Sequence, residues 1–133
     1  MSQAKYHAGQ SDARPWGRWE VVEAHSSYTL KRIEVNSGER LSLQYHNHRS
    51  EHWVVVAGCG TVTIGGDIMR VERGSHVYIP RETKHRIANE GAEPLVFVEI
   101  QFGDRLEEDD IVRVEDDYQR STIGLGLKER DLI

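Results

Sequence analysis

The stretch that decides the fold is residues 38–58, which read GERLSLQYHNHRSEHWVVVAG. Residues two apart on a strand point to the same face. Gln44, His46 and His48 are therefore expected to line one side of a strand and of the turn after it, and Glu51 to begin the next strand. The stretch predicts two consecutive strands that carry nitrogen and oxygen ligands for a metal ion.

A second stretch, residues 74–89, reads GSHVYIPRETKHRIAN and places His85 at the start of another strand, after a proline-led turn. A small barrel can aim three adjacent strands at one interior point, so we expect one site in which four side chains meet: Gln44, His46, Glu51 and His85. This donor set suits Zn, Mn, Fe or Co better than Ca or Mg, and its lack of thiolate argues against a purely structural zinc site. His48 is an alternative to Gln44, because His46 and His48 also form a His-x-His pair.

Outside these stretches the chain is a series of short β-rich runs separated by turn residues. Several runs alternate polar and apolar residues, which indicates half-buried strands. Their spacing of roughly ten residues is typical of an all-β sandwich or barrel. The expected strands are residues 19–24, 28–35, 41–45, 53–56, 61–64, 67–71, 76–79, 86–88 and 95–101.

Composition narrows the class of protein further. The chain has 133 residues, which fits one domain, and its net charge of -5 makes it a poor candidate for binding nucleic acid. It has no apolar run long enough to span a membrane and no apolar leader segment, so we expect no membrane partner. A single cysteine excludes an internal disulfide framework and fits a reducing cytoplasm.

The two ends differ from the middle of the chain. Residues 1–13 are predicted to be a disordered lead-in, residues 14–120 the folded domain, and residues 121–133 a tail or docking arm. Residues 105–120 carry an acidic run and then an apolar segment that suggests a late strand.

Both quoted stretches resemble the two sequence motifs of the cupin family. The first motif fits when Gln44 takes the place of its first histidine, and the second aligns Gly74, Pro80, His85 and Asn89. The usual glycine two residues after the proline is Glu82 here. The resemblance implies a small double-stranded β-helix, or jelly-roll, barrel.

A narrower resemblance covers about residues 14–120. The chain is similar to the type II mannose-6-phosphate isomerase domain, here without the nucleotidyltransferase domain that usually precedes it. One departure is Gln119, where the family usually has glycine. The resemblance rests on residues 14–17, 31–33, 41–53, 78–80, 85–86 and 107–113.

This resemblance implies a metal-dependent aldose–ketose isomerase that converts mannose 6-phosphate to fructose 6-phosphate. It implies that one divalent metal, held by the four ligands above, polarises the sugar oxygens. We assign contacts with the phosphorylated sugar to Lys31, Arg49 and Arg86, and the base to His48 or Glu99.

Other functions fit the same barrel. The main alternative is a non-catalytic sugar-binding or regulatory metal cupin, because a fold does not determine an activity. An Fe(II) dioxygenase and a metal-free nucleotide-sugar epimerase fit the residues less well. Because an uncapped sheet edge invites pairing, we also expect a homodimer.

Overall fold

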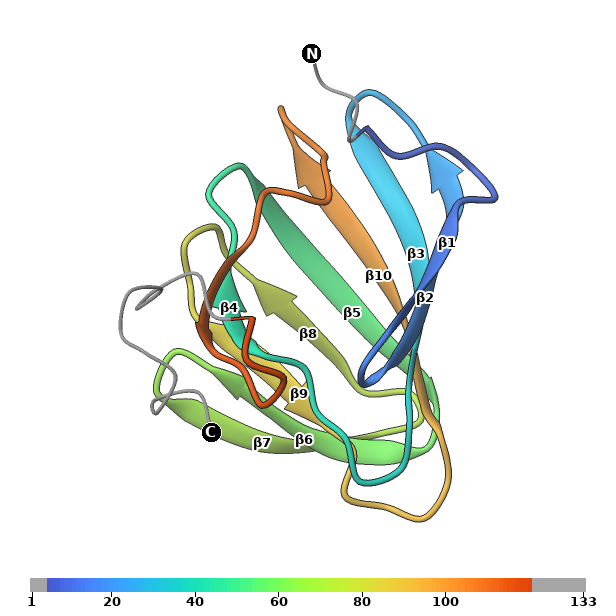
Figure 1. Cartoon of the computed structure of the whole chain (residues 1–133), viewed down its shortest axis with the longest axis vertical. Coiled ribbons are helices and arrows are strands. Elements are labelled where there is room, and N and C mark those ends of the chain that lie inside the picture. The colour runs from blue at the N-terminus through green and yellow to red at the C-terminus, as the bar shows by residue number, and fades with distance from the viewer. Residues whose placement is uncertain (1–4, 121–133) are drawn as a thin grey trace.

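The computed structural model describes residues 5–120, which form eleven β-strands and no helix (Figure 1). The predicted all-β class is confirmed, and all nine expected strands are present, with every end within four residues of its expected position. The strands are β1 (Ser11–Arg14), β2 (Gly17–Ala24), β3 (Tyr28–Val35), β4 (Leu43–Tyr45), β5 (Arg49–Ala57), β6 (Cys59–Ile64), β7 (Asp67–Glu72), β8 (His76–Ile79), β9 (His85–Ala88), β10 (Leu95–Gly103) and β11 (Val112–Glu115).

These strands form two antiparallel sheets that face each other, as Figure 1 shows. One sheet has the order β1-β2-β3-β10-β5-β8, and the other has the order β11-β4-β9-β6-β7. Strands distant in sequence are neighbours in both sheets, because the chain crosses repeatedly from one sheet to the other. The site residues of β5 and those of β4 and β9 therefore approach each other from opposite layers.

The core lies between the two sheets and follows from the alternation of side chains. In β3, buried residues alternate with half-buried ones along the whole strand, so one face of the strand packs inward. Phe97 from β10 and Ile87 from β9 are fully buried there, and Trp53 packs 4.7 Å from the Phe97 ring. This apolar layer surrounds the polar residues of the site and shields them from water.

The predicted disorder of the lead-in is wrong for the part that the structure describes. β1 pairs with β2 from Ser11 to Arg14, and the Tyr6 side chain is buried against Trp19. The polar sequence of β1 carries no alternation because it is an exposed edge strand, and for that reason the pattern missed it. Residues 1–4 and the predicted tail, 121–133, lie outside the described residues.

The late strand expected from residues 105–120 is β11, which pairs with β4. Over residues 5–120, no helix is long and apolar enough to cross a membrane. The expected homodimer concerns a second chain and stays a prediction.

Candidate metal and ligand-binding site

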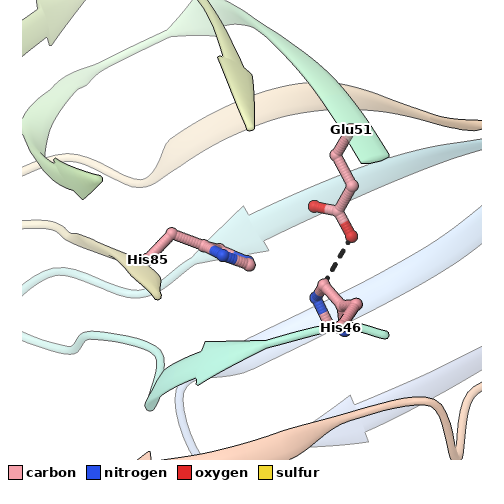
Figure 2. Close-up of side chains that lie close together, drawn as sticks. All are labelled: His46, Glu51 and His85. Atoms are coloured by element: carbon pink, nitrogen blue, oxygen red, sulfur yellow. Dashed lines mark ion pairs between the residues drawn. The ribbon is translucent and has the colours of Figure 1, made fainter. Parts of the chain in front are cut away.

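Three of the four predicted metal ligands converge inside the barrel, as Figure 2 shows. His46 follows β4, Glu51 lies near the start of β5, and His85 opens β9. One ligand atom from each lies within 4.8 Å of those of the other two, and all three residues are buried. The backbone N–H of Glu82 donates to the carbonyl oxygen of His46, which ties the two ligand-bearing loops together.

Backbone carbonyl groups orient both histidine rings. His46 Nδ1 lies 2.6 Å from the carbonyl oxygen of Asp110, and His85 Nδ1 lies 2.8 Å from that of Thr83. A carbonyl oxygen only accepts, so each Nδ1 carries the proton and each Nε2 keeps a lone pair, which in His46 faces Arg49 Nη2 at 3.4 Å. This is the arrangement that outer partners impose on metal-ligating histidines.

The electrostatics of the site keep both imidazoles neutral. Burial, followed by the positive charge of Arg49, lowers the pKa of His46 to about 3. Burial also lowers the pKa of His85. For Glu51, burial works to raise the pKa, but the opposing charges of His46, when protonated, and Arg49 outweigh it and hold this pKa below its ordinary value. Two neutral imidazoles and a carboxylate are the protonation states that a divalent metal requires.

Gln44 completes the ligand set better than His48 does. Gln44 is buried and lies directly opposite His85 in the β4–β9 pairing. Its Nε2 donates to the hydroxyl of Ser42 over 3.1 Å, and Oε1 is therefore the amide atom left for a metal. The His48 side chain is 40% exposed and lies 4.0 Å from Asp104, outside the pocket that holds the other ligands. The structure therefore corrects the assignment of His48 as a ligand or as the base.

Arg49 reaches the pocket, but its guanidinium has partners within the protein. Its Nε donates to Glu51 Oε2 over 2.8 Å, and its Nη1 donates to the carbonyl oxygen of Glu107. Trp53 Nε1 donates to the other oxygen of Glu51, also over 2.8 Å. These two donors fix the carboxylate of Glu51, so Arg49 orients a candidate metal ligand and also lines the pocket.

Lys31 is buried in the pocket wall within a cluster of its own. Its ammonium donates to the Tyr6 hydroxyl over 2.8 Å and to Glu108 Oε1 over 3.2 Å. It also lies 4.1 Å from the centre of the Tyr6 ring and 4.3 Å from that of Trp19. Burial lowers the pKa of Lys31, and the negative charge of Glu108 opposes that effect.

Arg86 does not reach the pocket, and its assignment to the sugar phosphate is corrected. Alternation along β9 sends His85 inward and Arg86 to the other face of the sheet. There Arg86 Nε donates to the carbonyl oxygen of Leu41 over 3.0 Å, and Nη1 lies 3.5 Å from Glu115.

Glu99 lies in the pocket wall, and its assignment as the base stays a prediction. Burial, with a smaller contribution from Glu51, raises the pKa of Glu99 to about 8. Gln101 Nε2 donates to its Oε2 over 2.5 Å. Burial therefore favours the protonated form of Glu99, and a carboxyl pKa raised towards neutrality is compatible with general acid–base chemistry.

The lining of the pocket around these residues includes groups that the sequence did not indicate. Arg14 comes from β1, Arg113 from β11, and Arg120 from the segment that follows β11. Arg14 and Arg113 fall within the stretches that carry the family resemblance and Arg120 lies beyond them, but no periodicity connects segments that far apart. The other lining residues missed by the prediction include Trp16, Trp19 and Glu108.

A family model described as "Mannose-6-phosphate isomerase C-terminal" matches residues 1–116. The chain belongs to this family. It is 45% identical over 116 residues to the mannose-1-phosphate guanylyltransferase ManC of Salmonella typhimurium, covering 87% of this chain and 24% of that protein. It is 49% identical over 107 residues to the mannose-1-phosphate guanylyltransferase of Escherichia coli, covering 80% and 22%. The alginate biosynthesis protein AlgA of Pseudomonas aeruginosa is 44% identical over 108 residues, with 81% and 22% covered.

Solved structures confirm the predicted cupin fold. A Klebsiella pneumoniae protein with a double-stranded β-helix domain superimposes with a TM-score of 0.64 at 19% identity, covering 73% of this chain and 78% of that one. The cupin domain of Schizosaccharomyces pombe Cnp3 superimposes with a TM-score of 0.63 at 17% identity, covering 65% and 64%. At these identities the likeness shows the fold alone.

The relatives correct the predicted function. They are named for guanylyl transfer to mannose 1-phosphate or for polysaccharide biosynthesis, and not for the isomerisation of mannose 6-phosphate. The predicted isomerase reaction is therefore wrong. The chain spans about a quarter of the length of these curated relatives. The names of the relatives place them in carbohydrate biosynthesis.

Proposed function

We propose that this cupin domain binds a divalent metal ion and, beside it, a phosphorylated sugar of the mannose 1-phosphate class. Gln44, His46, Glu51 and His85 would hold the metal. The ion would act as a Lewis acid towards sugar oxygens. The observation that carries the proposal is the buried convergence of His46, Glu51 and His85 at the base of a pocket lined by cations.

The donor set fits a transition metal. Both imidazoles are neutral and present Nε2 inward, and the carboxylate of Glu51 is held by two donors of its own. Nitrogen and oxygen ligands of this kind suit Zn, Mn, Fe or Co. The arrangement leaves room for ligand oxygens, because four protein ligands do not fill an octahedral coordination shell.

The charge of the pocket supports an anionic ligand. Five cationic and three acidic side chains line it, although the chain as a whole carries a net charge of -5. Glu99 adds little negative charge at neutral pH because burial raises its pKa to about 8. The cations are Arg14, Lys31, Arg49, Arg113 and Arg120.

Two of the arginines that line the pocket, Arg14 and Arg120, are held in position by carboxylates. Arg120 donates to Asp116 through Nε over 2.7 Å and through Nη2 over 3.1 Å. Arg14 donates to Asp12 and, over 3.1 Å, to Glu108. A guanidinium that is already oriented loses less conformational entropy when it binds a phosphate. Trp16 also lines the pocket and supplies an apolar ring for contact with a sugar.

Calorimetric titration tests the proposal. Protein freed of metal is loaded separately with Zn, Mn or Co and titrated with mannose 1-phosphate, with mannose and with inorganic phosphate. We expect mannose 1-phosphate to bind most tightly and to require the metal. We expect Arg120→Ala to weaken binding at least about tenfold, the cost of losing one charge-assisted hydrogen bond.

Arg70→Ala is the matched control, since Arg70 is an exposed arginine of β7 outside the pocket. It should bind as the unaltered protein does. His85→Ala should lose the metal, as measured by elemental analysis. Metal-loaded protein that fails to bind mannose 1-phosphate, or that binds mannose equally well, would overturn the proposal.

A further inference from the structure

One indole N–H in the pocket wall has no partner. Trp19 is only 4% exposed, and its Nε1 is one of three buried side-chain atoms in residues 5–120 that lack a hydrogen-bond partner. The other two belong to Arg86 and Gln101, which do not line the pocket. Buried polar groups in folded proteins are almost always paired. An unpaired donor beside a binding pocket therefore points to a partner that arrives with the ligand.

The contrast with Trp53 supports this interpretation. Trp53 lines the same pocket, and its Nε1 donates to Glu51 over 2.8 Å. Two other carboxylates of the pocket wall are engaged elsewhere. Glu108 accepts from Lys31, Arg14 and Tyr6, and Glu99 accepts from Gln101. No acceptor in residues 5–120 is within hydrogen-bond reach of Trp19 Nε1.

The neighbours of the ring hold it in place and determine which acceptor suits it. The Lys31 ammonium lies 4.3 Å from the ring centre and the Arg14 guanidinium 5.4 Å, while the Tyr6 ring meets it nearly edge-on at 5.9 Å. A rigid ring is a pre-organised donor. The two cations beside the ring can also donate to an oxygen that reaches the indole N–H, which favours an anionic oxygen over a neutral hydroxyl.

We propose that Trp19 Nε1 donates a hydrogen bond to the phosphate group of the bound sugar phosphate, next to Arg14. This inference rests on the proposed function and adds to it the location of the phosphate. It makes Trp19 a residue that determines specificity, since its N–H strengthens the binding of a phosphorylated sugar more than that of an unphosphorylated one.

Nuclear magnetic resonance of the indole groups tests the inference directly. The three tryptophans give three indole N–H signals, and Trp19→Phe identifies that of Trp19 by its loss. On addition of mannose 1-phosphate to metal-loaded protein, we expect the Trp19 signal to move downfield and the Trp53 signal to move less. Inorganic phosphate should produce the same shift, and mannose should not.

Calorimetry of the variants supplies the second readout. Trp19→Phe should weaken mannose 1-phosphate at least about tenfold. Because the N–H has no partner in the free protein, its removal by itself should not lower the thermal midpoint. Val21→Ala is the control, since Val21 is a buried residue of the same strand that does not line the pocket, and it should bind within about threefold of the unaltered protein.

The outcomes separate the two proposals. If the unaltered protein binds mannose 1-phosphate but the Trp19 signal does not move, or if Trp19→Phe binds normally, the inference is overturned and the proposed function stands. Equal weakening in Val21→Ala would attribute the effect to packing and also overturn it. A shift produced by mannose would assign the N–H to a sugar hydroxyl and overturn the phosphate assignment. If the unaltered protein binds no sugar phosphate, the proposed function itself fails.

Discussion

Replacing Glu108 by glutamine should destabilise the fold in a manner that depends on pH. Burial works to raise the pKa of Glu108, but Lys31, with help from the Tyr6 hydroxyl, outweighs burial and lowers this pKa from 4.5 to about 2. That difference corresponds to about 3 kcal/mol of stability at neutral pH. The Glu108 side chain is 31% exposed, so solvent screening reduces the expected loss in Glu108→Gln to about 2 kcal/mol.

The direction in which the stabilisation by Glu108 changes with pH follows from the direction of its pKa shift. The pKa of Glu108 is lower in the folded protein than in the unfolded chain, so its contribution is complete well above pH 4.5 and is lost as the pH falls towards 2. The difference in free energy of unfolding between the unaltered protein and Glu108→Gln should therefore shrink from about 2 kcal/mol at pH 7 to about 1 kcal/mol at pH 3.

Urea unfolding at both pH values measures this difference, and the m-value shows whether the two proteins unfold in the same way. Glu93→Gln serves as the control, because Glu93 is exposed and its replacement should change stability by less than about 0.5 kcal/mol. A loss in Glu108→Gln below about 0.5 kcal/mol at pH 7, or one that is equal at pH 7 and pH 3, would refute the account of the Lys31 cluster.

Three further measurements test the turns and the metal site. Gly58→Ala should lower the free energy of unfolding by about 2 kcal/mol or more in urea titrations, because Gly58 has a φ of 81° and an added Cβ would lie 2.5 Å from the carbonyl oxygen of Pro94. At Gly66 an added Cβ meets no atom within 4 Å, so Gly66→Ala should change the free energy of unfolding by less than about 0.5 kcal/mol. Glu82→Gly should raise the free energy of unfolding by about 0.5 kcal/mol, since Glu82 has a φ of 63° that glycine adopts without strain. Metal at one hundred times its dissociation constant should add about 2.7 kcal/mol to the unaltered protein and nothing to His85→Ala, as thermal unfolding would show.

The two motifs predicted the residues of the candidate metal site. Alternation placed Gln44, His46 and His48 on one side of a strand, spacing placed Glu51 at the start of the next strand, and the second motif added His85. This succeeded because each motif is a local feature, in which two or four residues of separation decide where a side chain points. The same alternation could have excluded Arg86, which follows His85 directly on β9.

The turn before His85 forms although one residue of the sequence motif is absent. The family places glycine where this chain has Glu82, and the structure keeps the turn by placing Glu82 in the left-handed region. The backbone N–H of Glu82 reaches the carbonyl of His46, so tertiary contact compensates for the absent glycine. His85 therefore keeps its position although the motif is incomplete.

The sequence by itself determined that this chain is a β-barrel of the cupin kind and predicted which residues form its candidate metal site. Only the tertiary structure decided which charges surround that site. Arg14 and Arg120 come from segments about a hundred residues apart, and no sequence period relates them. They meet because β1 and β11 each take an outer position in a sheet, next to β2 and β4 respectively. Strand alternation specifies the face on which a side chain lies, whereas the packing of the whole chain specifies what lies opposite it.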